Sequence, residues 1–164
     1  MALEIRTFGD PVLKSRATPV DKFDESLEHL AQEMLETMRD HEGVGLAANQ
    51  VGRLKRILVA ALEDEEYVIV NPEINGRRDE SEKDMEGCLS IPEIQVEVER
   101  SSRITVSGQD QSGAPVQLEA EGLLARILQH EVDHLNGILI TDRTDRESRK
   151  VAMRELRERL LAQR

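Results

Sequence analysis

Two histidines four residues apart give the sharpest chemical signal in the sequence. His130 and His134 enclose Glu131 in the pattern H-E-x-x-H. On a helix this spacing places both imidazoles on one face, at a separation that suits two bonds to one metal ion, and the carboxylate between them can serve as a general base. The alternative is a helix with two hydrogen-bonded core histidines, although burying both beside a carboxylate without a metal is unfavourable.

A metal held by two histidines lacks a ligand, because catalytic sites of this type use three protein ligands and leave the fourth position to water. The metzincin pattern requires a third histidine where this chain has Ile140. Glu155 and Glu158 lie downstream, but arginines crowd Glu155 in the sequence. Cys88, the single cysteine, is the other candidate, since a thiolate with two imidazoles suits Zn²⁺ or Fe²⁺. A buried cysteine without a ligand is the alternative.

A third segment, residues 43–50, reads GVGLAANQ. Its two glycines and two alanines let a backbone or a ligand approach closely, and Gln50 offers an amide donor at its end. It is not a phosphate-binding loop, because no Lys followed by Ser or Thr comes after it. Taken alone, the segment also fits a simple helix end followed by a bend.

The strands expected around these three segments lie in runs between the expected helices. A helix from about 24 to 42 is expected to begin at the capping residue Asp24 and to end at Gly43. The H-E-x-x-H pattern lies in a helix over about 122–135, and a last helix covers about 145–163. Asn71-Pro72 is expected to end the second strand. Strands are expected at 57–62, 67–70, 94–98, 104–107 and 116–120. This order predicts an α+β fold.

Length and composition indicate one soluble globular domain. The 164 residues have the size of one domain, and neither a repeat nor a linker divides residues 1–164. No apolar run approaches the ~20 residues that span a bilayer, so no membrane partner is expected. The N-terminus lacks the basic and apolar parts of a signal peptide, and one cysteine cannot form an internal disulfide, so we expect a cytoplasmic protein. A net charge of −11 argues against DNA as a partner.

The C-terminal segment differs in charge from the rest of the chain. On a helical wheel, six basic side chains fall within one arc of roughly 80°. They are Arg143, Arg146, Lys150, Arg154, Arg157 and Arg164. Like charges at i, i+4 repel one another, so a stripe of one sign favours a polyanionic partner. The alternative is a solvated helix that docks through its apolar side.

Together the three segments resemble the peptide deformylase family, whose motifs are G-x-G-L-A-A-x-Q, E-G-C-L-S and Q-H-E-x-D-H. This sequence has them in the same order at 43–50, 86–90 and 129–134. Residues 9–13 also resemble the start of the family, so the similarity covers about 3–145. It implies antiparallel sheets packed around a central helix that carries H-E-x-x-H, with an N-terminal and a C-terminal helix.

The resemblance also implies a reaction: metal-dependent hydrolysis that removes the N-formyl group from the initiator methionine of new proteins and releases formate. Cys88, His130 and His134 would hold one divalent ion, natively Fe²⁺, with Zn²⁺, Ni²⁺ or Co²⁺ able to replace it. The partners would be N-formylmethionyl nascent peptides and, through the basic C-terminal helix, the ribosome. Two alternatives are an ordinary H-E-x-x-H peptidase that cleaves internal bonds and a structural Cys-His₂ metal module.

The family similarity assigns roles to further residues. Glu131 would take a proton from water and pass it to the leaving amine. The Gln50 side-chain amide and the Leu89 backbone N–H would stabilise the oxyanion. Val44 and Gly45 would bond the substrate backbone as an added strand.

One position departs from the family pattern. Arg126 lies four residues before His130, where members often have an apolar residue in the methionine pocket. Its aliphatic stem could line that pocket while the guanidinium reaches water. An arginine at this position leaves open how strongly the pocket prefers methionine.

Overall fold

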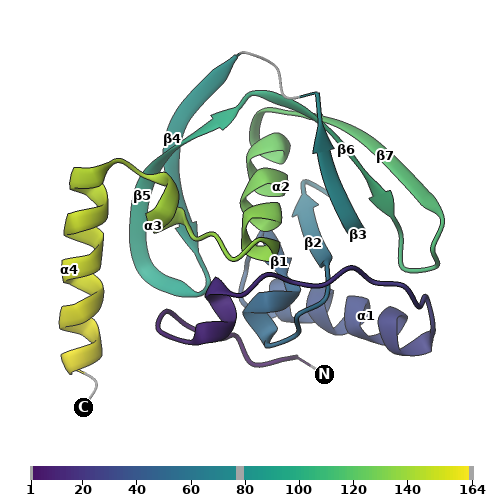
Figure 1. Ribbon diagram of the computed structural model, residues 1–164, viewed down its shortest axis with the longest axis horizontal. Helices are drawn as coiled ribbons and strands as arrows, with labels where there is room; N and C mark the ends of the chain where they lie inside the picture. The colour runs from purple at the N-terminus through teal and green to yellow at the C-terminus, as the bar shows by residue number, and fades with distance from the viewer. Residues whose placement is uncertain (1, 77–79, 163–164) are drawn as a thin grey trace.

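The computed structural model describes residues 2–76 and 80–162, which form helices and antiparallel strands (Figure 1). The helices are α1 (Glu25–Asp40), α2 (Gly122–Leu135), α3 (Ile140–Arg143) and α4 (Arg146–Ala162), with 3-10 turns η1 (Pro11–Lys14) and η2 (Ala48–Val51). The strands are β1 (Gly45–Ala47), β2 (Ile57–Leu62), β3 (Glu65–Asn75), β4 (Ser81–Cys88), β5 (Ile91–Ser101), β6 (Arg103–Gln109) and β7 (Pro115–Glu121). Within these residues no helix is long and apolar enough to cross a membrane.

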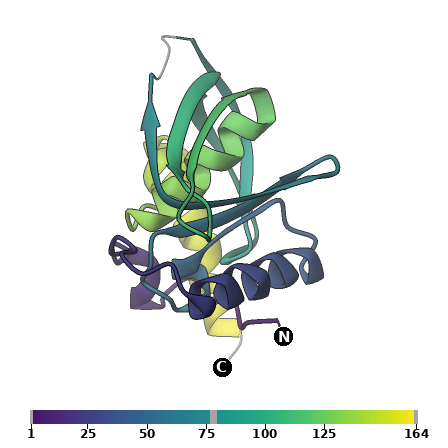
Figure 2. The ribbon, with the colours of Figure 1, turned by 90° about the vertical axis from the view of Figure 1, so that its right-hand side faces the viewer.

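Two sheets enclose helix α2. One has five strands in the order β1-β2-β3-β6-β7, the other is the ribbon β4–β5, and all neighbours are antiparallel. Figure 1 shows α2 between the ribbon and the larger sheet, and Figure 2 shows α1 on the far side of that sheet. Ala125 and Leu128 of α2 are fully buried in one core cluster with Leu58 and Val106 of the larger sheet. The expected α+β arrangement around a central helix is confirmed.

Helix α1 forms for the reasons that its sequence predicts. The Asp24 side chain accepts a hydrogen bond from the Leu27 backbone N–H at 3.1 Å and caps the helix. The apolar stripe packs on strand β2, beside Ile57 and Val59. Its members Leu27, Leu30, Met34 and Met38 are all buried. Burial of each such side chain stabilises the fold by about 1.5–3 kcal/mol relative to an exposed one, which holds α1 against strand β2.

Strand β3 differs from the sequence expectation, because it does not end at Asn71-Pro72. The pairing with β6 shifts register between Val70 and Glu73, and Asn71 adopts a φ of 52°. The Asn71 amide accepts from the Val20 N–H at 2.8 Å and donates to the Val20 carbonyl at 2.9 Å. The pair therefore makes a bulge inside a continuing strand, which the N-terminal segment stabilises.

Candidate metal centre and active site

Helix α2 and strand β4 bring three metal-ligating atoms together. His130 Nε2 lies 3.2 Å from His134 Nε2, and Cys88 Sγ lies 3.3 Å from the same nitrogen. The three ligand atoms all lie within 4.8 Å of one another. The i, i+4 spacing on α2 produces the histidine pair, as the sequence predicts.

Cys88 reaches this position because the β4–β5 ribbon changes register there. Gly87 pairs with Gln95, but Cys88 pairs with Ile91, and Leu89 and Ser90 form the turn between the strands. Such an irregularity re-aims a side chain at the end of a ladder. The Ser90 N–H points at the sulfur at 3.4 Å. The end of the strand therefore delivers a thiol directly beside the two imidazoles.

Glu131 lies next to these ligands with one carboxylate oxygen unsatisfied. Oε1 is buried and has no hydrogen-bond partner in the part of the chain that the structure describes. A buried carboxylate oxygen without a partner is unfavourable, so the site needs a further donor or cation there. One sulfur and two imidazole nitrogens are the donor set of Zn²⁺ and Fe²⁺ sites, so the residues present fit a divalent metal.

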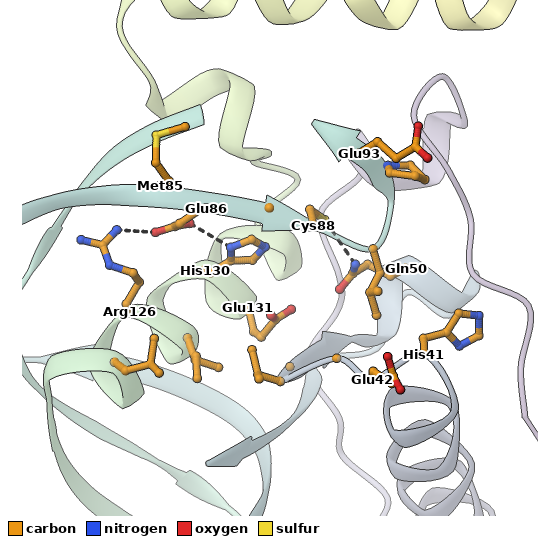
Figure 3. Close-up of a pocket in the computed structure, with 18 residues that line it drawn as sticks. His41, Glu42, Gln50, Met85, Glu86, Cys88, Glu93, Arg126, His130 and Glu131 are labelled. Atoms are coloured by element: carbon orange, nitrogen blue, oxygen red, sulfur yellow. Dashed lines mark hydrogen bonds and ion pairs between the residues drawn. The ribbon is translucent and has the colours of Figure 1, made fainter. Parts of the chain in front are cut away.

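Gly45 of strand β1 allows Glu131 to approach the strand. A Cβ on Gly45 would lie only 2.5 Å from Glu131 Oε2, so any larger residue would displace the carboxylate. Burial raises the pKa of Glu131 to about 7. Figure 3 shows this carboxylate projecting from α2 into the cavity. A carboxylate that titrates near neutrality can both accept and return a proton.

Glu86 is the buried partner of His130. Glu86 Oε1 lies 2.9 Å from His130 Nδ1, and Arg100 binds the same carboxylate through Nε at 3.0 Å and Nη2 at 2.9 Å. Burial raises the pKa of Glu86, but the hydrogen bonds from His130 and Arg100 outweigh it and hold the pKa at about 2. A charged carboxylate only accepts, so His130 carries its proton on Nδ1 and turns Nε2 toward the ligand cluster.

The position of Arg126 corrects the sequence expectation in part. Arg126 lines the cavity, as expected. Its guanidinium, which the sequence was expected to place in water, donates to Glu86 Oε2 at 2.6 Å, and only 11% of the side chain stays exposed (Figure 3). The sequence could show only that Arg126 lies on the same face of the helix as His130, because the two are four residues apart. The partner on β4 could not be read from spacing, since it lies 40 residues away along the chain.

Gln50 and Leu89 lie on the other side of the thiol. The Gln50 carbonyl oxygen accepts from the Ala47 N–H at 2.9 Å, which turns the amide nitrogen toward Ser90 Oγ at 3.1 Å and Cys88 Sγ at 3.6 Å. The Leu89 N–H donates no hydrogen bond to the described residues. The Gln50 amide nitrogen therefore lies beside the thiol, and Leu89 lines the same cavity.

Strand β1 is an edge strand beside the cavity. It pairs with β2 on one side, and no described strand pairs with its other side. The Val44 carbonyl accepts from the Ala61 N–H at 2.8 Å, so the backbone groups of Gly45, which alternate with those of Val44, face the free side. The cavity has a volume of about 600 Å³. It is lined by apolar side chains that include Val44, Leu123 and Ile127.

The chain is similar in sequence and structure to known deformylases. A family model described as polypeptide deformylase matches residues 2–150. A peptide deformylase from Dictyoglomus thermophilum is 51% identical over 150 residues, which cover 92% of this chain and 97% of that one. The crystal structure of a peptide deformylase from Legionella pneumophila has the same fold, with a TM-score of 0.92 and 41% identity, and the match covers 100% of this chain and 99% of that one. The crystal structure of peptide deformylase from Thermotoga maritima also has this fold, with a TM-score of 0.87 and 51% identity, and the match covers 88% of this chain and 99% of that one. With a match over nearly its whole length, this chain belongs to the polypeptide deformylase family.

Proposed function

We propose that this chain is a metal-dependent hydrolase that removes the N-formyl group from the initiator methionine of newly synthesised proteins and releases formate. The observation that carries the proposal is the convergence of Cys88, His130 and His134 beside the unpaired oxygen of Glu131. The family match supports the same reaction, since its members are peptide deformylases. New chains are made in the cytoplasm, so we place its action there.

Cys88, His130 and His134 would hold the divalent ion. When bound, the ion supplies Lewis-acid chemistry and lowers the pKa of water. Glu131 takes a proton from the attacking water and delivers it to the amine that leaves with the methionine. This carboxylate is buried, with 5% of the residue exposed, which limits proton exchange with bulk solvent.

The remaining groups bind and stabilise the substrate. We assign the Gln50 amide and the Leu89 N–H as donors to the formyl oxygen as it gains negative charge. The free backbone edge at Gly45 would add the substrate backbone as a strand, with Val44 packing against it. The methionine side chain then enters the apolar part of the cavity, beside Leu123 and Ile127.

The reaction can be separated from that of an ordinary peptidase. Incubation of the metal-loaded chain with formyl-Met-Ala-Ser is expected to give formate and intact Met-Ala-Ser, measured by formate detection and mass spectrometry. A matched Met-Ala-Ser peptide without the formyl group is expected to stay intact. Cleavage of either peptide at Met-Ala would contradict the proposal and identify a peptidase.

We propose Fe²⁺ as the native ion, with Zn²⁺, Ni²⁺ and Co²⁺ able to occupy the same ligands. An Fe²⁺–thiolate site exposed to air is expected to lose activity, because oxygen oxidises the iron or Cys88. The Ni²⁺ form of the same preparation is expected to keep its activity for many times longer. The measurement is the half-life of formate release in air for the two forms. Equal half-lives would contradict an oxygen-sensitive native site.

We further propose that helix α4 belongs to the same domain, spanning residues 1–164, and docks on the ribosome. Ala152 and Leu156 are buried against β5, which supports a helix held on the catalytic core. The basic stripe is smaller than the sequence suggested. Arg143 lies in α3 and binds Asp133 at 2.8 and 3.0 Å, and Arg164 lies outside the described residues.

Four exposed basic side chains of α4 make no ion pair within the part of the chain that the structure describes. They are Arg146, Lys150, Arg154 and Arg157. Changing all four to Glu is expected to abolish co-sedimentation with ribosomes at low salt and to leave deformylation of a short peptide unchanged. A control with the same change in charge elsewhere replaces Arg16, Lys22, Arg53 and Arg103 by Glu. Undiminished co-sedimentation of the α4 variant would show that the stripe is only a solvated face.

A further inference from the structure

Arg126 links three parts of the site through its guanidinium. Nη1 donates to Glu86 Oε2 at 2.6 Å and to the Val98 carbonyl at 2.9 Å, and Nη2 donates to the Glu82 carbonyl at 2.8 Å. Glu82 and Glu86 lie on β4, the strand that ends at Cys88, and Val98 lies on β5. Arg126 therefore ties the helix that carries both histidines to the ribbon that carries the cysteine.

The Glu86 carboxylate receives donors on both oxygens. Oε1 faces His130 Nδ1 and Arg100 Nη2, and Oε2 accepts from Arg100 Nε and Arg126 Nη1. Its side chain is only 5% exposed, so water cannot replace a missing donor without entering the core. Arg100 holds the carboxylate from β5, whereas Arg126 holds it from α2 itself, one turn from His130. Two guanidinium groups from different elements thus fix the carboxylate orientation.

The two histidines differ in how their rings are held. His130 has Glu86 on its Nδ1, whereas His134 Nδ1 is buried without a hydrogen-bond partner among the described residues. The partner of a ligating histidine fixes its tautomer and its ring orientation. In this site only His130 has such a partner among the described residues, and the partner is the Glu86 carboxylate that Arg126 holds.

We propose that Arg126 is a positioning residue of the metal centre: it fixes Glu86 against His130 and locks the His130 helix to the Cys88 strand. This rests on the proposed metal site. Arg126 also lines the cavity, so one residue borders the proposed methionine pocket and orients a ligand. Arg126 is therefore part of the site rather than a solvated side chain.

The ion pairs around the buried carboxylates of Glu86 and Asp133 indicate that Arg126 can be replaced without unfolding the core. Arg100 also donates to Asp133 at 2.5 Å, and Asp133 binds Arg143. The array therefore holds three arginines and two carboxylates. Arg126→Met keeps the apolar stem and leaves two arginines for two carboxylates, so no unpaired charge is created.

The test is the rate at which purified Zn²⁺-loaded protein loses its metal to an excess of chelator. Arg126→Met is expected to lose zinc about 10- to 100-fold faster than the wild type, the range typical for partners behind a ligand. Arg126→Lys, which keeps a charge but not the paired geometry, is expected to lie between them. The matched control is Arg103→Met, at an exposed arginine that pairs with Glu121 outside the cavity, and it is expected to keep the wild-type rate.

A second measurement separates positioning from general stability. In ¹⁵N-histidine spectra of the zinc form, the His130 Nδ1–H signal is expected to exchange faster with water in Arg126→Met, while that of the Arg103→Met control is unchanged. If Arg126→Met does not fold, the Lys variant decides by the same two measurements. Wild-type zinc loss and an unchanged Nδ1–H signal in a folded Arg126 variant would overturn the proposal. A wild-type chain that binds no zinc would instead refute the metal site itself.

Discussion

Glu131→Gln is expected to bind its metal normally and to lose about 10²- to 10⁴-fold in kcat. Glutamine has nearly the same shape but cannot accept the proton from water. Because Oε2 lies against Gly45, the substituted amide still fits the space that strand β1 leaves. The measurement is formate release under single-turnover conditions, together with metal content of the same sample.

A matched carboxylate separates this effect from a change in overall charge. Glu119 is exposed on β7, outside the cavity, so Glu119→Gln removes the same charge without touching the site. Its kcat is expected to equal that of the wild type. Wild-type turnover by metal-loaded Glu131→Gln would show that another group moves the proton.

Cys88→Ser and His134→Ala are each expected to lose the metal, from stoichiometric binding to trace content. Each removes one of three ligand atoms that lie within 4.8 Å of one another, and two protein ligands hold a divalent ion weakly. The measurement is elemental analysis after dialysis against a chelator.

His29→Ala is the control for these ligand variants, because the His29 side chain is 76% exposed and does not line the cavity. It is expected to keep its metal. Full metal retention by Cys88→Ser would refute the assignment of the thiol as a ligand, whatever its activity.

Local sequence signals predicted the elements that hold the site. The capping residue and apolar stripe of α1 and the face of α2 that carries His130 and His134 both follow from helical periodicity, which depends on neighbours within one turn. Such features need no knowledge of distant segments.

Contacts between distant segments account for what the sequence missed. Residues 81–85 of β4 are all exposed, and all but Met85 are polar. No alternation of apolar residues therefore marks this strand in the sequence, and its pairing with β5 defines it. Arg143 was expected on the basic stripe, but it pairs with the buried carboxylate of Asp133, while 39% of its own side chain stays exposed. Neither partner lies at a spacing that a helical wheel or a strand pattern reports.

The most direct test measures metal content and formate release from formyl-Met-Ala-Ser on the same anaerobically purified sample, before and after chelation. The account predicts stoichiometric divalent metal with rapid formate release in the first state. After chelation it predicts no release, with recovery when Fe²⁺ or Ni²⁺ is added back. Undiminished formate release by the metal-free chain would contradict a reaction that depends on an ion held by Cys88, His130 and His134.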